Sequence, residues 1–291
     1  MRTVLRLSDG PLRALLWSVL LLLASMATVS CGGSAADGLP DDALVLVVSS
    51  DLAVGARRVL VSALGPDNES LVTDEPVGLG FFAPDGSLRE EVPARFVWAI
   101  PESTGMWVAD FLFDSPGRWT PAVRTVDGRL VRGAPFAVAA ESLAVDVGDP
   151  APASRSKTLA DGPIETITSD PHPDRRLYEV SVAEAVGSGR PSVIVFATPA
   201  FCVSRTCGPA LDTAKTLIDR YPGAAWIHVD VYDNLDATSP EELVPVPAAV
   251  EWGLPSEPWV FVVNEDGVVT DRFEGLVGVT ELEHALQRVG L

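Results

Sequence analysis

An apolar strand that runs directly into two cysteines and a helix is the feature that most constrains this chain. The predicted strand covers residues 192–196, the cysteines are Cys202 and Cys207, and a helix-period stretch follows over residues 210–221. Backbone N–H groups at a helix N-terminus stabilise a thiolate, which is the reactive form of cysteine. Because two cysteines five positions apart on one helix would point about 140° away from each other, a bridge between them requires Cys202 to lie in the loop before the helix.

Pro209 and Arg205 bear on how this junction is built. Proline prefers the first turn of a helix, so we expect Cys207 or Gly208 to lie near the N-cap. Arg205 lies between the two cysteines, and its charge could lower the pKa of a nearby thiol, although a solvated loop arginine has the same sequence pattern. The cysteine pair itself could be redox-active or could form an inert disulfide that pins a loop.

The third cysteine, Cys31, closes an N-terminal export segment. Basic residues come first, an apolar run covers residues 14–24, and small residues end the segment, which is the order of a secretory signal peptide. The segment is also similar to the bacterial lipoprotein signal, although Thr28 stands where an aliphatic residue is usual. We therefore predict that residues 1–30 are a lipoprotein-type signal peptide, that Cys31 carries a lipid, and that the chain is anchored at the extracytoplasmic face of the cell membrane. An uncleaved anchor is the alternative, because residues 14–31 just meet the ~18-residue length of a membrane span.

Export also accounts for the cysteine count. If Cys31 carries a lipid, Cys202 and Cys207 remain as an even pair in a compartment where disulfides persist. The net charge of -19 gives a surface that repels nucleic acid, so we expect no nucleic-acid partner. With the signal peptide removed, about 260 residues remain, which is enough for two domains of ordinary size.

Two regions with different patterns follow the signal. A tether of small and acidic residues covers 31–43, and residues 44–140 consist of short apolar runs separated by turn signals. About seven strands at this spacing predict an all-β antiparallel sandwich. The passage over residues 105–119 resembles immunoglobulin-like modules of bacterial exported proteins, which implies an immunoglobulin-like sandwich.

The pattern changes after residue 140. Residues 141–156 are predicted to form an extended linker, and strands alternate with helices over residues 157–291. A capping box at Ser181 opens a short helix, and Thr280 is expected to cap a final helix over residues 281–289. This alternation predicts an α/β layer fold for the second domain.

Residues 148–291 resemble the thioredoxin superfamily in the order and spacing of four features. These are a strand-to-cysteine passage over 196–202, the sequence Cys207-Gly208-Pro209, a proline segment over 254–258 before an apolar strand, and a hairpin sequence over 264–267. The resemblance implies a thioredoxin-like fold, catalytic roles for Cys202 and Cys207, and no cofactor. It also implies that Pro258 is cis, that the backbone of Glu257 and Pro258 positions a partner strand, and that Phe201 packs beside the sulfurs.

The chain departs from that family in two ways. Four residues separate the cysteines instead of the usual two, so either Cys202 or Cys207 could occupy the attacking position. The distance from Phe196 favours Cys202. Val195 occupies the place where family reductases carry a buried acid, so the sequence shows no evident proton acceptor for the buried thiol.

These features predict a thiol–disulfide oxidoreductase that acts on the thiols and disulfides of exported proteins. Cys202 would attack a partner disulfide, and Cys207 would release the partner. Copper(I) binding by the two thiolates is an alternative, although residues 254–259 lack the histidine of the copper-chaperone branch. Peroxide reduction would need a Thr or Ser closer to the cysteine than Thr198. A non-catalytic binding lipoprotein with a structural disulfide is a further alternative.

We expect no metal site, because the three histidines are far apart in the sequence. His228 and Asp230 alternate with apolar residues on one predicted strand. We expect these two side chains to face a boundary between layers of the fold.

Overall fold

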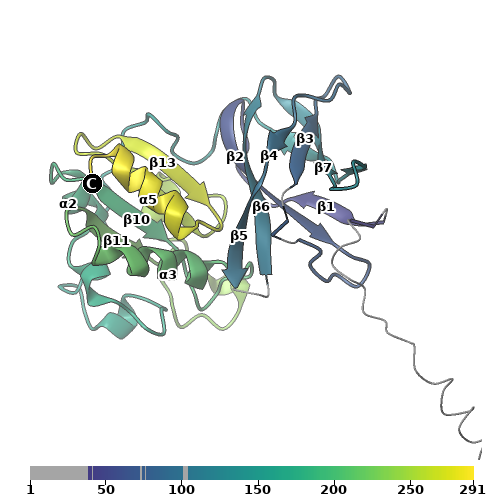
Figure 1. Cartoon of the computed structure of the whole chain (residues 1–291). Coiled ribbons are helices and arrows are strands. Elements are labelled where there is room, and N and C mark those ends of the chain that lie inside the picture. The colour runs from purple at the N-terminus through teal and green to yellow at the C-terminus, as the bar shows by residue number, and fades with distance from the viewer. Residues whose placement is uncertain (1–38, 41, 73, 76, 101–103) are drawn as a thin grey trace, which may run out of the picture. The chain divides into compact units, whose positions relative to one another are not determined.

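The computed structural model describes residues 39–291 apart from residues 41, 73, 76 and 101–103 (Figure 1). The described chain is mostly β-strand with few helices. The predicted signal peptide, the lipidation site Cys31 and most of the tether lie outside these residues. No helix within the described ranges combines the length and the apolar character needed to cross a membrane.

The first part of the described chain, residues 39–139, is built from strands and is called the β half here. One sheet has the order β1-β2-β6-β5 and the other β4-β3-β7-β8, with β9 paired to β7. All of these pairs are antiparallel. The strands are β1 (Leu44–Val47), β2 (Gly55–Leu64), β3 (Gly78–Phe82), β4 (Val92–Pro93), β5 (Arg95–Ile100), β6 (Thr104–Phe113), β7 (Gly117–Arg124), β8 (Leu130–Arg132) and β9 (Phe136–Val138).

The two sheets of the β half share one hydrophobic core. Phe111 and Phe113 of β6 meet Phe81 of β3 and Trp119 of β7 in this core. The rings of Phe113 and Trp119 lie edge-on with 5.0 Å between their centroids, which is a favoured aromatic geometry. Leu112 lies between the two phenylalanines in sequence and is exposed, because successive residues of a strand point to opposite faces.

The second part, residues 140–291, alternates strands and helices as the sequence predicts, and is called the α/β half. Its sheet has the order β11-β10-β12-β13, in which β10 and β11 are parallel and the other pairs antiparallel. Its helices and strands are α2 (Val182–Val186), β10 (Ser192–Phe196), α3 (Cys207–Ile218), β11 (Ala225–Val229), α4 (Pro247–Glu251), β12 (Trp259–Val263), β13 (Val269–Glu274) and α5 (Val279–Arg288). Short 3-10 helices cover Ile164–Thr166, Arg175–Tyr178 and Pro240–Glu242.

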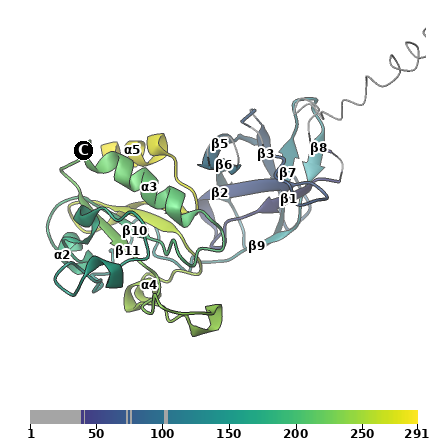
Figure 2. The ribbon, with the colours of Figure 1, turned by 90° about the horizontal axis from the view of Figure 1, so that it is seen from below.

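Helices cover both faces of this sheet, with α3 and α5 on one side and α2 and α4 on the other (Figure 2). Along β10, Val193 and Val195 face the first of these layers, while Ile194 and Phe196 face the second. A strand covered on both faces is apolar at every position rather than at every second one. This explains why the strand before the cysteines has an unbroken apolar sequence.

One edge of the sheet brings together the chain segments around Cys202 and Cys207, and we call it the disulfide edge. Phe196 at the end of β10 pairs with Trp259 at the start of β12, and Trp259 pairs with Glu274 at the end of β13. Helix α3 begins after β10, and α5 begins after β13. The start of α3, the start of β12 and the end of β13 therefore lie at the same edge.

The segment predicted as an extended linker, residues 141–156, is hydrogen-bonded along the α/β half. Its N–H groups at Val145, Gly148 and Ala151 donate to the carbonyls of Trp252, Val269 and Gly267, respectively, at 3.1, 2.8 and 2.8 Å. Ala144 and Ala151 are buried. These contacts fasten the segment to β13 and to the end of α4.

The helix starts were predicted to different extents. Helix α3 begins at Cys207, as expected from Pro209 although before the helix-period stretch at 210, and α5 begins at Val279 with Gly278 as its N-cap instead of Thr280. In α5 the carboxylate of Glu281 accepts the Gly278 N–H at 3.3 Å. A capping carboxylate reaches back three residues, so Glu281 selects Gly278 and not Thr280. The capping box at Ser181 is present as predicted.

Candidate functional site

Cys202 and Cys207 are joined by a disulfide, with 6.0 Å between their Cα atoms. Cys207 is the first residue of α3, and Cys202 lies in the preceding loop, which is the arrangement that bridging requires. The Cys207 side chain is completely buried under the sheet face that α3 covers. Cys202 is partly exposed at the border of the same cluster. The two sulfurs therefore differ in their access to solvent.

A tight turn brings the Cys202 sulfur to the start of the helix. Arg205 adopts a left-handed backbone conformation with φ of 59°, and its N–H donates to the Cys202 carbonyl at 3.3 Å. The chain then returns so that the Cys207 N–H donates to the Cys202 sulfur at 3.2 Å. N–H groups of the first helical turn have no partner within the helix. One of these free donors is thus directed at Cys202.

Ser204 provides a second polar contact to the same sulfur. Its hydroxyl lies 3.3 Å from Cys202 Sγ and 2.7 Å from the hydroxyl of Thr206. In the reduced protein, the Cys207 N–H and the Ser204 hydroxyl would both donate to a thiolate on Cys202 and stabilise it. The sequence analysis did not identify Ser204, because its approach to the sulfur depends on the left-handed turn at Arg205.

The structure gives Arg205 a conformational role in this turn. Its side chain is exposed, and within the described ranges it makes no hydrogen bond or ion pair. The predicted effect of its charge on a thiol stays a prediction. The neighbouring Val203 is 96% exposed, so the loop between the cysteines faces solvent.

The proline segment lies at the same sheet edge as the cysteines. The Glu257–Pro258 bond is cis, as the sequence analysis expected. The Glu257 carboxylate accepts the N–H of Thr198 at 2.6 Å, and Thr198 lies in the loop that leads from β10 to Cys202. In the described part of the chain, no hydrogen bond engages the backbone N–H or C=O of Glu257.

Glu257 is a titratable group that is hydrogen-bonded directly to the cysteine loop, residues 197–206. Burial raises the pKa of Glu257 to about 7, the Thr198 hydrogen bonds oppose this rise, and the charge of Asp230 adds to it. The place of the family's buried acid is filled by Val195, which is completely buried. The carboxyl group with a pKa near 7 at this site is therefore Glu257 of the proline segment, and β10 provides none.

Phe201 directly precedes Cys202, and its packing beside the sulfurs stays a prediction. The ring contact that the structure gives it is edge-on with Tyr232, with 6.4 Å between the centroids. Its N–H donates to the Thr198 carbonyl at 3.0 Å and so closes the turn before Cys202. Phe201 thus helps to shape the loop between Thr198 and Cys202.

His228 faces a boundary between layers, as predicted. The carbonyl of Ala197 can only accept, so the Nε2–H of His228 donates to it at 2.9 Å. In the neutral ring, Nδ1 then accepts from the Tyr178 hydroxyl at 2.7 Å. Because Ala197 directly follows β10, this chain of hydrogen bonds fixes the start of the cysteine loop.

Asp230 accepts from both the N–H and the hydroxyl of Ser169, at 3.0 and 2.6 Å. It thereby ties the end of β11 to the segment after the first 3-10 helix. Across the residues that the structure describes, no group of three or more His, Cys, Asp or Glu side chains could hold a metal ion.

The chain is similar to solved structures and not to known sequences. No protein-family model matches the chain, and no curated protein matches it. The chain is similar to a structure from Chlorobium tepidum that is provisionally assigned as a DsbE thiol:disulfide interchange protein. The two share 15% sequence identity with a TM-score of 0.34, over 50% of this chain and 98% of that one.

Proposed function

We propose that this chain is a thiol–disulfide oxidoreductase that exchanges disulfides with exported proteins while anchored to the extracytoplasmic face of the membrane. The hydrogen bond from the Cys207 N–H to the Cys202 sulfur is the observation that carries the proposal. It directs a helix N-terminus at the more exposed of two bonded sulfurs. This is the microenvironment in which a cysteine becomes reactive.

The exchange needs only the two sulfurs and a partner disulfide. The Cys202 thiolate attacks one partner sulfur, forms a mixed disulfide and releases the other partner sulfur as a thiolate. The Cys207 thiolate then attacks Cys202 Sγ, which closes the Cys202–Cys207 disulfide and releases the second partner thiolate. The partner gains two electrons and this protein loses two, so no cofactor is required. The reverse sequence oxidises a partner dithiol.

The proline segment supports partner binding. The backbone N–H and C=O of Glu257 carry no hydrogen bond within the described part of the chain, and Glu257 lies next to the cysteine loop through its contact with Thr198. A partner strand that pairs with this backbone would bring its own sulfur to Cys202. Glu257 and Pro258 are therefore proposed to position the partner.

The proposal extends to the fold families and the location. Residues 157–291 would form a thioredoxin-like domain, supported by the order of strands and helices, by the cysteines at the start of α3 and by the cis proline before β12. Residues 44–140 would form an immunoglobulin-like sandwich, supported by the two antiparallel sheets around one core. The lipid on Cys31 and the extracytoplasmic location rest on the sequence of the export segment.

A trapping experiment tests the redox proposal. A Cys207→Ser variant of the reduced protein lacks the sulfur that resolves a mixed disulfide, so it should accumulate an adduct with a synthetic peptide that contains a disulfide. The Cys202→Ser variant is the matched control and should form far less adduct, because Cys207 is buried. Absence of an adduct with the Cys207→Ser variant, or equal adducts with both variants, would contradict the proposal.

A further inference from the structure

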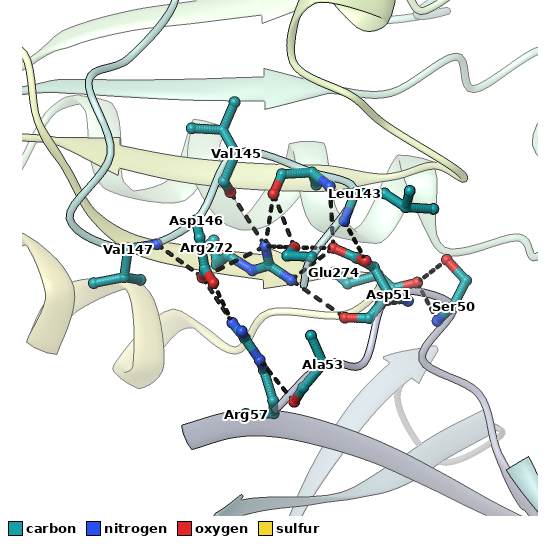
Figure 3. A network of polar contacts seen from close by, with 12 residues as sticks. Ser50, Asp51, Ala53, Arg57, Leu143, Val145, Asp146, Val147, Arg272 and Glu274 are labelled. Atoms are coloured by element: carbon teal, nitrogen blue, oxygen red, sulfur yellow. Dashed lines mark hydrogen bonds and ion pairs between the residues drawn. The ribbon is translucent and has the colours of Figure 1, made fainter. Parts of the chain in front are cut away.

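A loop of the β half is hydrogen-bonded to the proline segment, residues 254–258. The loop between β1 and β2 contains Ser50, whose N–H and hydroxyl donate to the Glu274 carboxylate at 2.7 and 2.5 Å (Figure 3). The hydroxyl of Ser256 donates to the same carboxylate at 3.1 Å and lies 2.9 Å from the Ser50 hydroxyl. Glu274 therefore joins a residue of the β half to a residue of the proline segment.

A buried ion pair fixes this loop on β13. The carboxylate of Asp51, the residue after Ser50, accepts from Arg272 at 2.9 Å (Figure 3). The side chains of Asp51 and Arg272 are only 2% and 10% exposed. Because removing one partner of a buried ion pair leaves a charge without full compensation, the pair holds the loop to β13 in a defined geometry.

Asp51 also supports the residue that precedes the proline segment. Its carboxylate accepts the Leu143 N–H at 2.9 Å. Gly253 lies so close to Leu143 that a Cβ atom at position 253 would overlap the Leu143 carbonyl oxygen. Gly253 has a φ of 65°, in the left-handed region that glycine adopts without strain. The β half thus reaches the start of the proline segment through Leu143.

The rest of the proline segment is attached to the α/β half. The Pro258 carbonyl accepts the Gly275 N–H at 2.9 Å, and the Glu257 carboxylate accepts the Thr198 N–H at 2.6 Å. Thr198 belongs to the cysteine loop. The proline segment is therefore bound both to the β half and to the cysteine loop, while the backbone N–H and C=O of Glu257 carry no hydrogen bond within the described ranges.

We propose that Ser50 and Asp51 are positioning residues for the exchange reaction, because they hold the free backbone of Glu257 beside the cysteine loop. The inference rests on the proposed function. It also defines the substrate class as an extended polypeptide disulfide, since a polypeptide can pair with this backbone as an added strand and a small disulfide cannot. Ser50 acts through Ser256 and Glu274 and contacts no reacting sulfur.

The test compares an extended synthetic peptide that contains a disulfide with bis(2-hydroxyethyl) disulfide, which has no peptide backbone. Exchange with the reduced protein is followed as a function of the concentration of each probe. In Ser50→Ala, the half-saturating concentration of the peptide should rise by up to about tenfold, because a hydrogen bond to a carboxylate contributes a free energy of that order. The limiting rate, and the rate with the small disulfide, should keep their wild-type values, because the two sulfurs are unaltered.

Three variants control for this effect. Ser256→Ala should act in the same direction as Ser50→Ala, since it removes the other hydroxyl on Glu274. Ser50→Thr should restore the wild-type value for the peptide, because it keeps the hydroxyl and the exposed site has room for a methyl group. Ser115→Ala removes a hydroxyl that donates to Asp114 at 2.9 Å in the turn between β6 and β7, and it should change neither rate.

The outcomes separate the two proposals. If the wild-type protein exchanges with neither probe, the oxidoreductase proposal fails, and the positioning role falls with it. If the wild-type protein reacts and Ser50→Ala keeps the wild-type values with the peptide, only the positioning role is overturned. The same holds if Ser50→Ala slows exchange with both probes by the same factor, or if the wild-type protein reacts with the small disulfide and not with the peptide.

Discussion

The backbone N–H of Cys207 donates to the sulfur of Cys202 over 3.2 Å. Cys207 is at once the buried partner in the disulfide and the residue whose main chain supports the exposed sulfur. When the disulfide is reduced, the Cys207 N–H is already in place to donate a hydrogen bond to the Cys202 thiolate, and the Ser204 hydroxyl supplies a second hydrogen-bond donor. The reactivity of Cys202 should therefore depend on residues of its own loop.

Removal of the Ser204 hydroxyl should make reduced Cys202 less reactive. A hydrogen bond to a charged group contributes about 1.5 kcal/mol or more, so Ser204→Ala should slow alkylation of Cys202 near neutral pH by up to about tenfold. The measurement is the rate of iodoacetamide modification as a function of pH. Ser87→Ala in the β half serves as the control. A pH profile identical to that of the wild type would show that the hydroxyl has no role.

Glu257 should make stability depend on pH. Its pKa in the folded protein is about 7 against an ordinary value of 4.5, because of burial. The folded state holds the proton more tightly, so this contribution is complete below pH 4.5 and is lost as the pH rises through 7. One pKa unit corresponds to about 1.4 kcal/mol, so the loss is on the order of 3 kcal/mol.

Urea unfolding of Glu257→Gln and wild type at pH 5 and pH 8 measures this effect. Glutamine cannot ionise, so the variant should gain stability relative to the wild type between these two pH values. Other titrating groups cancel in the comparison, because both proteins carry them. A difference between the two proteins that stays constant with pH would contradict the assignment.

Removal of Asp51 should lower the free energy of unfolding, because its carboxylate pairs with the buried guanidinium of Arg272. Burial by itself would raise the pKa of Asp51, but hydrogen bonds from Ser142 and Leu143 and the charge of Arg272 hold it below 3.8. Its stabilisation is therefore present at neutral pH and lost as the pH falls through the lowered value. Asp51→Ala leaves the buried guanidinium with only its longer ion pair to Asp146, at 3.6 Å, and should destabilise the protein by about 3 kcal/mol. The double variant Asp51→Leu/Arg272→Met should recover most of this loss in denaturant unfolding, and a double variant as unstable as Asp51→Ala would argue against the ion pair.

Tyr178→Phe should destabilise the start of the cysteine loop. The substitution removes the closer of two hydroxyls at Nδ1 of the buried His228, the Tyr178 hydroxyl at 2.7 Å, and leaves the Thr168 hydroxyl at 3.4 Å, at a cost of about 1 kcal/mol. Thermal unfolding measures this cost, with the partly exposed Tyr221→Phe as the matched control. Equal melting temperatures for the two variants would mean that the His228 network does not hold Ala197 in place.

Local patterns predicted the elements that surround the site. The unbroken apolar sequence of β10, the proline at position 209 and the five-residue spacing of the cysteines were enough to place Cys207 at a helix start and Cys202 in the loop. Each of these features acts over a few residues, through helix geometry or strand burial. Such features can be inferred from sequence alone.

Contacts between distant residues could not be predicted in this way. Asp51 and Arg272 are 221 positions apart, and nothing in the composition of either segment selects the other. The pKa of Glu257 is raised because the folded chain buries this carboxyl, and burial of a side chain in the proline segment depends on residues far from it in the sequence. The Ser204 hydroxyl lies near the Cys202 sulfur because Arg205 adopts a left-handed backbone conformation, which non-glycine residues adopt infrequently.

The reduction potential of the Cys202–Cys207 couple tests the central claim most directly. Redox equilibration of the purified protein against dithiol buffers, with the fraction of free thiol measured by alkylation, gives this value. A redox-active pair with a stabilised Cys202 thiolate should equilibrate above about -300 mV, and Ser204→Ala should lower the potential. A potential below about -300 mV, unchanged by that substitution, would identify a structural disulfide and contradict the account.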